Sequence, residues 1–479
     1  MSDRIFSKGK MGIDANRPID VGSGAIAPQY ANPTIIADTG AAFVRLNFVL
    51  GPWRSPADTT LHAGRTWFQT YDTIVDGLLA KGLGVYALVG AEATSRPDPG
   101  NRFRQPTPSP DAEDWLREYV ANFAAIVAHF AGRIHIYESF NEPNDWHGGQ
   151  SSWVHPYWFA RMLRDIYQKI KIDDRRDVIL VSGPLLTHDL PGGGDDGTAY
   201  LDQTYRLGRQ SHGWEAFQAA HGTYPLDDIG YHLYVGLSPT AAPADIEAVI
   251  TRYLNAIWSV ITRYEGNLTE KGLHVSEYGW TSDNGEAKQA SNLQTAFRLL
   301  RDHPRVKTAA WFCLQDFPGQ NYGLYRAGAF TASNRKQAYA AFKALCAESV
   351  PAPLVGYDSA GRSYPAIIAA YERNGGEKVL GVPTDNGGGV YVHRWGAGVV
   401  QDFINSKGQK AIIMLKDGAS QAYVVRGVIH NRYIYTYGGA LGPLGYPVED
   451  QGEDEWGLPR CRFEHGIIGC RTYTEIYEE

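Results

Sequence analysis

Short apolar runs alternate with longer amphipathic stretches through about the first 345 residues of the chain. The apolar runs are rich in Val, Ile and Tyr and lack the regular polar alternation of a half-exposed strand. Such runs are typical of parallel strands that are buried on both faces of a sheet. The pattern predicts eight strands, at residues 10–14, 42–48, 84–90, 133–140, 178–183, 229–234, 273–277 and 309–314.

The stretches between these runs have the apolar period of α-helices, and they predict helices at residues 115–130, 157–172, 244–265, 287–301 and 335–345. Eight strands that alternate with helices over this length predict an α/β fold of the (β/α)8 TIM-barrel type with long loops. A doubly wound sheet is the alternative fold, but no glycine-rich phosphate-binding sequence follows the first strand.

The pattern changes after Val350-Pro351-Ala352-Pro353, which has the composition of a short, stiff linker. We therefore predict a barrel domain at residues 1–346, a linker at 347–353 and a second domain at 354–479. The second domain is rich in Gly, Tyr and Val and has β-like alternation, which predicts a small β-rich domain.

This second domain contains an internal repeat. Residues 375–385 match residues 439–450, and both copies contain Leu-Gly, then Val or Tyr, then Pro. A further hairpin is predicted between the two copies, from 411–415 to 422–428. Repeats of this kind stack on one another to bury a shared small core.

Length and charge narrow the class of protein. The 479 residues exceed one ordinary core, which indicates two or more domains. A net charge of -7 argues against a nucleic-acid partner. No apolar run is long enough to predict a membrane span. The first residues lack the apolar core of a signal peptide, so we expect either a cytoplasmic protein or one whose signal is not part of this sequence.

The cysteines indicate no metal site. Neither a CxxC pair nor an HExxH motif is present, so no metal and no cofactor is predicted. Cys313 and Cys346 lie in apolar surroundings and are expected to be buried thiols. Cys461 and Cys470 flank a predicted hairpin, where they either form a disulfide or remain thiols; a disulfide would indicate an oxidising compartment.

Two glutamates at strand ends carry the candidate chemistry. Glu142 follows the fourth predicted strand, and Glu277 ends the seventh. Catalytic groups of TIM barrels lie at the carboxyl ends of the strands. Paired carboxyl groups across a glycosidic bond serve as nucleophile and acid/base in retaining hydrolysis. The pair therefore predicts cleavage of glycosidic bonds.

The sequences around both glutamates strengthen this prediction. Asn141-Glu142-Pro143 and Ser276-Glu277-Tyr278-Gly279-Trp280 resemble the strand-4 and strand-7 motifs of the clan A retaining glycoside hydrolases. The resemblance covers about residues 10–346. It implies that Glu142 is the acid/base, that Glu277 is the nucleophile and that Asn141 binds the 2-hydroxyl group of the substrate.

The same resemblance implies further site residues. Arg45 resembles the strand-2 arginine that contacts the nucleophile, and His232 and Tyr234 resemble a strand-6 pair near it. Trp311 resembles the strand-8 tryptophan beneath the cleavage point. Trp146 and Trp280, which follow the two glutamates, are candidates for stacking on sugar rings.

The second domain resembles the LGFP repeats of bacterial cell-envelope proteins, over about residues 354–471. This resemblance implies an extracellular or cell-envelope location and a possible contact with cell-wall glycan. The alternative is an appendage that only stabilises the barrel.

The leading hypothesis is a retaining β-glycoside hydrolase that is endo-acting on a polysaccharide, with a polysaccharide or oligosaccharide as its binding partner. One alternative is an exo-acting β-glycosidase. The other, from a different class, is a non-catalytic carbohydrate-binding or envelope-anchoring protein.

Overall fold

The chain divides into two units, one spanning residues 4–348 and the other containing residues 349–479. The computed structural model describes the whole chain except residues 1–5, 7–8, 99–100, 146–152, 188–195, 237, 267–268, 270, 304, 349–354, 359–361, 386–388, 406, 471–475 and 479. None of the helices in the described part is long and apolar enough to cross a membrane.

The first unit is built on one parallel sheet with the strand order β5-β4-β3-β2-β1-β9-β8-β7-β6. Val181, at the end of β5, forms a parallel bridge with Asp228, directly before β7. β5 and β6 therefore occupy one strand position, and the sheet closes into a barrel of eight positions. The strands are β1 (Met11–Asp14), β2 (Phe43–Asn47), β3 (Gly84–Val89), β4 (Ile136–Ser139), β5 (Ile179–Val181), β6 (Leu185–Leu186), β7 (Ile229–Leu233), β8 (Leu273–Tyr278) and β9 (Val306–Phe312).

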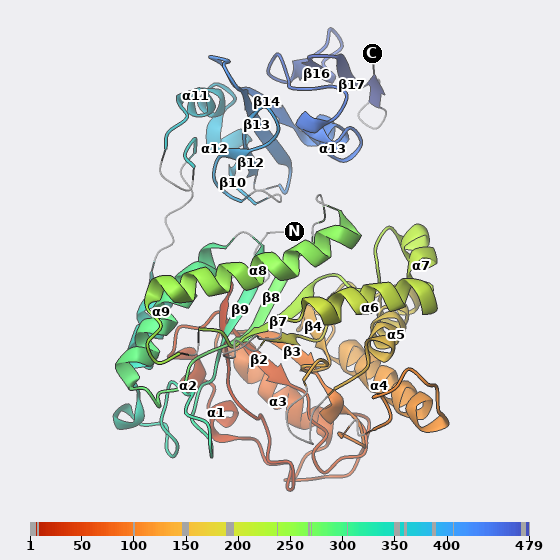
Figure 1. Ribbon diagram of the computed structural model, residues 1–479, viewed down its shortest axis with the longest axis vertical. Coiled ribbons are helices and arrows are strands. Elements are labelled where there is room, and N and C mark those ends of the chain that lie inside the picture. The colour runs from red at the N-terminus through yellow and green to blue at the C-terminus, as the bar shows by residue number, and fades with distance from the viewer. Residues whose placement is uncertain are drawn as a thin grey trace. The chain divides into compact units, whose positions relative to one another are not determined.

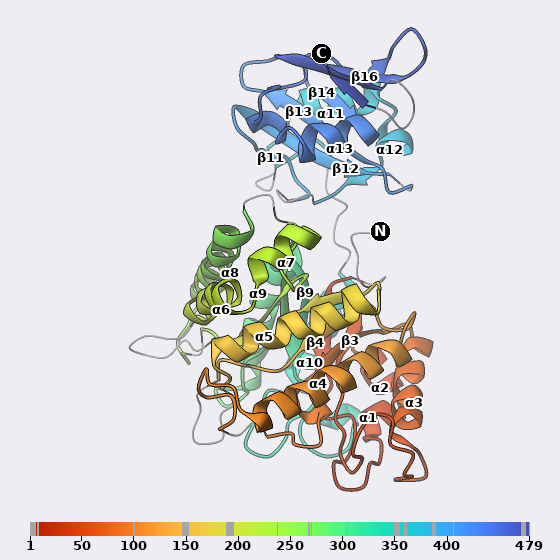
Figure 2. The same cartoon turned by 90° about the vertical axis from the view of Figure 1, so that its right-hand side faces the viewer.

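Helices surround these strands, which lie at the centre of the unit (Figures 1 and 2). They are α1 (Pro28–Ala31), α2 (Thr34–Ala37), α3 (Trp67–Ala80), α4 (Pro110–His129), α5 (Pro156–Tyr167), α6 (Thr198–Ser211), α7 (Trp214–His221), α8 (Pro243–Glu265), α9 (Glu286–Asp302) and α10 (Gln337–Ala347). This closed arrangement confirms the predicted TIM-barrel fold and excludes the doubly wound alternative.

Alternation along the strands separates two layers of packing. Tyr86, Ile136 and Ala310 belong to a small cluster inside the barrel. Their neighbours Tyr137 and Trp311 belong to the large core between strands and helices. Because side chains of a strand point alternately to its two faces, the layer of each residue follows from whether its position along the strand is odd or even.

One predicted strand is displaced. The sequence predicts a strand at 309–314, whereas β9 begins at Val306 and ends at Phe312. The apolar pattern missed the start because two polar residues are satisfied by neighbours. Lys307 Nζ forms an ion pair with Asp228 at 2.8 Å, and Thr308 Oγ1 lies 2.8 Å from His274 Nδ1.

The second unit contains two antiparallel sheets. The first consists of β10 (Val382–Pro383), β11 (His393–Arg394), β12 (Gly398–Ile404), β13 (Lys410–Lys416) and β14 (Tyr423–Arg426). The second consists of β15 (Gly452–Glu453), β16 (Pro459–Phe463), β17 (Gly466–Cys470) and β18 (Ile476–Glu478). The pairing of β13 with β14 confirms the predicted hairpin between the repeat copies.

Helices cover both faces of the first of these sheets, which the prediction of a β-rich domain did not include. They are α11 (Pro365–Arg373), α12 (Gly376–Val379) and α13 (Gly427–Tyr435). Ile413 on β13 shares a core with Ile367 on α11, while its neighbour Ile412 shares another core with Ile429 on α13. The two small cores therefore lie on opposite sides of one sheet.

The sequence repeat is also a structural repeat. Tyr371 Oη donates to the Gly381 carbonyl at 2.6 Å, and Tyr433 Oη donates to the Gly445 carbonyl at 2.7 Å. Both glycines adopt positive φ angles, +85° and +68°, in the Leu-Gly turn that the copies share. Each tyrosine also stacks on a phenylalanine of the following strands.

The register of the last hairpin separates its two cysteines. Cys461 lies opposite Ile468, and the turn is closed by the pair of Phe463 and Gly466. Cys470 is therefore farther from the turn than Cys461, so the two cysteines do not lie opposite each other. Both are free thiols.

Candidate active site

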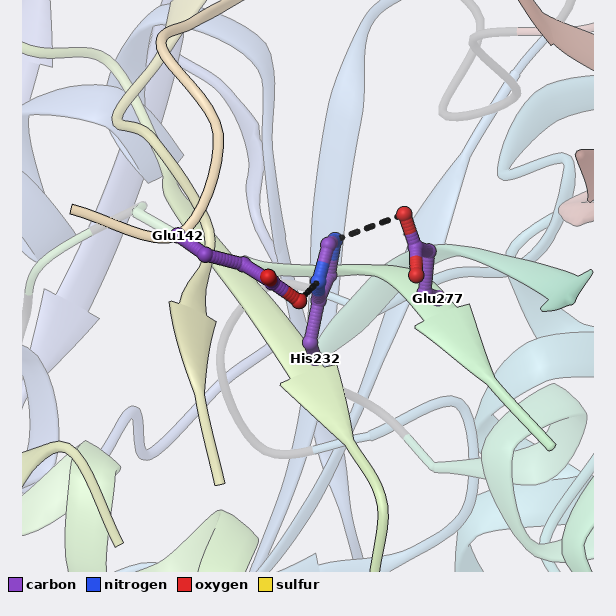
Figure 3. A group of neighbouring side chains, drawn as sticks. All are labelled: Glu142, His232 and Glu277. Carbon is purple, nitrogen blue, oxygen red and sulfur yellow. Dashed lines mark hydrogen bonds and ion pairs between the residues drawn. The ribbon is translucent and has the colours of Figure 1, made fainter. Parts of the chain in front are cut away.

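Glu142 and Glu277 meet at the carboxyl ends of the strands, on either side of His232 (Figure 3). His232 Nδ1 lies 2.7 Å from Glu142 Oε1, and its Nε2 lies 3.6 Å from Glu277 Oε1. A carboxylate oxygen of each glutamate and a ring nitrogen of the histidine all lie within 4.8 Å of one another. The structure therefore brings together two glutamates that are far apart in the sequence.

An irregularity in β8 turns Glu277 into the barrel. Tyr231 on β7 pairs with Val275, but the next residue, His232, pairs with Glu277, which leaves Ser276 as an extra residue in β8. A bulge of this kind shifts the alternation of side chains by one position. Val275 packs against the helices, and without the bulge Glu277 would face the same way.

Glu142 reaches the same place through an irregular backbone. Phe140 and Glu142 both have positive φ angles, +69° and +46°. Such angles are uncommon for residues other than glycine and are found where the surrounding structure enforces them. Asn144 holds this turn: its Nδ2 donates to the Leu186 carbonyl at 2.9 Å, and its Oδ1 accepts from the Leu186 N–H at 2.8 Å.

Arg45, on β2, joins the charged groups of the site. Its guanidinium donates to Glu138 Oε2 through Nε at 3.0 Å and Nη2 at 2.8 Å, and to Asn141 Oδ1 at 2.9 Å. Its Nη1 donates to Glu277 Oε1 at 2.5 Å and to Asp14 Oδ2 at 3.3 Å. Burial lowers the pKa of Arg45, but the three carboxylates together raise it well above its usual value, so the guanidinium stays charged.

Glu138 is the buried counter-ion of Arg45. Glu138 pairs with Arg45 and not with Arg133. Glu138 has no exposed surface, and its Oε1 accepts from the Tyr86 hydroxyl at 2.9 Å. Arg133 instead donates to Asp76 at 3.0 Å. Glu138 thus orients the guanidinium toward Glu277.

Glu277 is a buried carboxylate with a donor on each oxygen. Arg45 donates to Oε1, and the Tyr234 hydroxyl donates to Oε2 at 2.5 Å. Burial raises the pKa of Glu277; His232 and Arg45 oppose the rise, and the charges of Glu142 and Asp14 add to it. The net direction is upward, so Glu277 ionises at a higher pH than an exposed glutamate but is well supported once ionised.

His232 is a neutral side chain at neutral pH. Burial lowers the pKa of His232 to about 4. Nε2 lies 3.1 Å from Ser276 Oγ, and Nδ1 lies against Glu142. A neutral imidazole carries one N–H. If Nε2 carries the proton, it donates toward Ser276, and the lone pair of Nδ1 accepts the proton of a protonated Glu142.

Glu142, His232 and Glu277 are also of the residue types that bind metal ions. Chelation requires one ring nitrogen and both carboxylates to converge on one point. Here each ring nitrogen faces a different carboxylate, so the imidazole separates the two glutamates (Figure 3). The arrangement fits proton transfer better than metal binding.

The structure does not place Trp311 at the site, contrary to the prediction. Its side chain is fully buried between strands and helices, against Tyr278 and Trp280. The next residue, Phe312, has the parity that faces the barrel mouth, and its ring lies 6.2 Å from that of Tyr234 and 5.6 Å from that of Tyr322.

The structure does not place Trp280 at the site either. Trp280 is buried and donates from Nε1 to the Gly236 carbonyl at 3.1 Å, so its ring braces a loop rather than facing a ligand. This corrects the prediction that it stacks on sugar. Trp146 lies outside the described residues.

Four residues of the site were not recognised as site residues from the sequence. Asp14 ends the first predicted strand, a position that carries functional groups in barrels, and this signal could have found it. Asn144 follows the Asn-Glu-Pro motif directly. Ser276 and Phe312 depend on the bulge in β8 and on the register of β9, which the hydrophobic pattern does not encode.

Comparisons with known proteins give no family for the chain. No protein-family model matches it. No curated protein matches it either. Solved structures that resemble it are glycoside hydrolases, at low identity and with TM-scores below 0.5. The site assignment therefore depends on the geometry of this chain's own residues.

Three of these structures illustrate the range. A family 39 glycoside hydrolase from Bacteroides cellulosilyticus WH2 is 15% identical, with a TM-score of 0.46 over 88% of this chain and 72% of its own. A GH5_18 protein from Streptomyces cattleya, in complex with Manb1-4GlcNAc, is 14% identical, with a TM-score of 0.46 over 73% of this chain and 84% of its own. A GH128 endo-beta-1,3-glucanase from Sorangium cellulosum is 17% identical, with a TM-score of 0.41 over 70% of this chain and 98% of its own.

Proposed function

We propose that the barrel is a retaining glycoside hydrolase that cleaves β-glycosidic bonds by double displacement. The observation that carries this proposal is the approach of Glu142 and Glu277, because one carboxylate oxygen of each lies within 4.8 Å of the other. Retaining enzymes hold their two carboxyl groups about 5–5.5 Å apart, whereas inverting enzymes leave about 6.5–9.5 Å for a water molecule. The spacing in this chain supports the retaining class.

In the first step, Glu277 attacks the anomeric carbon and Glu142 gives its proton to the departing glycosidic oxygen. The carbon–oxygen bond of the substrate breaks while an ester bond to Glu277 forms, so the leaving group departs as a neutral alcohol. With its own proton on Nε2, His232 accepts a hydrogen bond from protonated Glu142 through Nδ1, which supports Glu142 as the acid.

In the second step, Glu142 takes a proton from water as the water oxygen attacks the anomeric carbon. The ester bond breaks, Glu277 leaves as a carboxylate, and Glu142 is protonated again. Two inversions at the same carbon leave the product with the configuration of the substrate.

The neighbours of Glu277 have matching roles. Arg45 and Tyr234 stabilise the charge that returns to Glu277 when the ester breaks, because each donates to one of its oxygens. Arg45 also holds Asn141 Oδ1. The amide nitrogen of Asn141 is then the group that donates to the substrate 2-hydroxyl, a contact that strengthens in the transition state.

We propose that the enzyme cleaves a polysaccharide internally, because the sequence predicts long loops at the barrel mouth. Product analysis tests this on a panel of β-1,3- and β-1,4-linked glucans, mannans and chitin. Internal cleavage gives early mixtures of oligosaccharides and a rapid fall in viscosity. Release of single sugars from the first minutes would instead indicate exo-cleavage.

Azide rescue tests the two glutamate assignments separately. Glu142→Ala should lose its activity toward natural substrates and regain turnover of an activated aryl glycoside with azide, giving a glycosyl azide of retained configuration. Glu277→Ala should give a glycosyl azide of inverted configuration. Glu247→Gln, on the exposed side of α8, is the matched control. Wild-type turnover by Glu277→Gln would refute the proposed nucleophile.

A further inference from the structure

A groove of about 320 Å³ lies in the second unit, between the start of β13 and the exposed side of α13. Val428, Asn431 and Tyr435 line it from the helix, and Gln409 and Lys410 line it from the strand. The Tyr435 side chain is 55% exposed, which is unusual for so large an aromatic residue. A volume at the lower end of the range for small-molecule sites suits a short piece of a ligand.

The other repeat copy shows that the fold does not require these residues. Tyr371 and Tyr433 occupy equivalent places, 62 residues apart, because each donates to the carbonyl of the shared Leu-Gly turn. The same offset places Ala366, Ala369 and Arg373 where α13 has its groove residues: Val428, Asn431 and Tyr435. Arg373 is engaged in its own unit, where it donates to Asp450 at 2.7 Å and to the Ala422 carbonyl at 2.8 Å.

The polar groups of the groove are mostly donors. The Gln409 amide oxygen accepts from Asn405 at 3.0 Å, and the Asn431 amide oxygen lies 3.1 Å from His430 Nδ1. Burial lowers the pKa of His430 to about 4, so its ring is neutral. With its proton on Nδ1, the ring donates to the Asn431 amide oxygen and leaves the amide nitrogen turned outward. Within the described residues, neither amide nitrogen has a protein acceptor.

Lys410 completes the set and fixes the aromatic ring. Its ammonium group donates to the Tyr435 hydroxyl at 3.0 Å and lies 5.7 Å from the centre of the ring. The groove therefore combines one exposed aromatic face with two amide N–H₂ groups and one cation. A matching ligand has a flat apolar face and carries acceptors along its edge.

We propose that this groove binds a sugar unit of a polysaccharide that carries a carbonyl or carboxylate acceptor, as an N-acetylated or uronic sugar does. The C–H face of the sugar packs on Tyr435, and the acceptor faces Gln409, Asn431 and Lys410. This binding does not require turnover, so it can be tested separately from the proposed catalysis in the barrel.

A depletion assay with the full chain tests the proposal, in a Glu277→Gln background that prevents digestion of the polymer. The probes are insoluble chitin for the N-acetyl group, cross-linked polygalacturonate for the carboxylate, and insoluble β-1,3-glucan as a polymer without either acceptor. We expect retention on chitin or polygalacturonate to exceed retention on the glucan.

Tyr435→Ala should weaken this retention about tenfold, the loss expected for an aromatic stacking contact and its buried area. Tyr435→Phe should keep most of it. Tyr391→Ala, a tyrosine of the same unit outside the groove, should bind as the parent does, and matched melting curves show that the variants fold. Lys410→Gln should reduce binding to polygalacturonate more than to chitin.

The proposal is overturned if the parent protein is retained on neither acceptor-bearing polymer. It is equally overturned if Tyr435→Ala and Tyr391→Ala bind alike on every polymer. Retention through the barrel alone gives this second result, because Tyr435 belongs to the second unit and not to the barrel.

Discussion

The barrel mouth and the groove of the second unit carry their polar groups in opposite ways. At the barrel mouth, Arg45 and Glu138 are almost completely buried and hold one another in place. In the groove, Tyr435 and Gln409 lie at the surface on a framework that is repeated elsewhere in the unit. In both regions, the candidate functional residues lie where a regular pattern is interrupted. In the barrel, the strand pattern is interrupted by a bulge and by residues with positive φ angles. In the second unit, the backbone repeats, but the side chains of one repeat copy differ from those of the other.

This difference predicts that removing a buried charge from the barrel lowers the free energy of unfolding, whereas removing an exposed charge from the second unit does not. Arg45→Met leaves Glu138 buried without its partner, so the free energy of unfolding should fall by about 3–5 kcal/mol. Arg394→Met removes an ion pair with Asp417 whose side chains are 61% and 54% exposed, and it should leave stability unchanged within error. Urea unfolding of both variants measures this. A similar stability for both would contradict the contrast.

The bulge residue Ser276 offers the next largest effect. Its hydroxyl lies 3.1 Å from His232 Nε2, and we expect it to accept a hydrogen bond from this nitrogen and so to favour the Nε2–H tautomer. Ser276→Ala removes this preference, so the Nδ1–H form gains and donates to the carboxylate of Glu142. We expect kcat to fall about tenfold, as for a weakened general acid, and the alkaline limb of the pH profile to move to lower pH.

Ser276→Thr provides the control for that variant, because it keeps the hydroxyl and should restore both kcat and the profile. Nitrogen-15 NMR of His232 reads the tautomer directly. An unchanged tautomer in Ser276→Ala would show that the serine is only a packing residue of the bulge.

The two repeat copies predict smaller losses of stability, one in each copy. Tyr371→Phe and Tyr433→Phe each remove one hydrogen bond to the carbonyl of a Leu-Gly turn. Each should cost about 1 kcal/mol of unfolding free energy, with the larger loss at Tyr433, because its hydrogen bond is buried and that of Tyr371 is only partly buried. Urea unfolding followed by circular dichroism measures both. Losses that differ severalfold would mean that the copies do not carry equal loads, and the comparison that isolates Tyr435 would weaken.

The regular parts of this molecule could be predicted from the sequence more fully than the irregular ones. Eight apolar runs sufficed to predict the barrel, and strand ends sufficed to find Glu142 and Glu277. The apolar pattern did not show that Trp311, placed at the site by resemblance, faces the helices while Phe312 faces the barrel mouth. It also gives no warning of the extra residue in β8. Bulges and register depend on the pairing of distant strands, which a local pattern does not contain.

The helices of the second unit were missed for a related reason. Both α11 and α13 have nine residues, so each presents only two turns of amphipathic pattern. Their stability comes from packing against the two faces of a sheet whose strands lie elsewhere in the sequence. Helices of this length are marginal in isolation, and the β-like pattern of the surrounding residues dominated the prediction.

The smallest predicted effect concerns the acidic side of the pH–activity profile, which is called its acid limb. Glu277 has to be ionised to attack, and its pKa lies above the ordinary 4.5 because of burial, with the charge of Asp14 adding to the rise. Activity should therefore be half-lost at a pH above 4.5. Asp14→Asn removes one negative charge, makes ionisation of Glu277 easier and should move this limb to lower pH by a fraction of a unit. Asp20→Asn, at an exposed carboxylate in the loop that follows β1, should leave it in place. A limb that moves upward in Asp14→Asn would mean that the loss of orientation of Arg45 outweighs the loss of repulsion, and that Asp14 serves the site through the guanidinium rather than through its own charge.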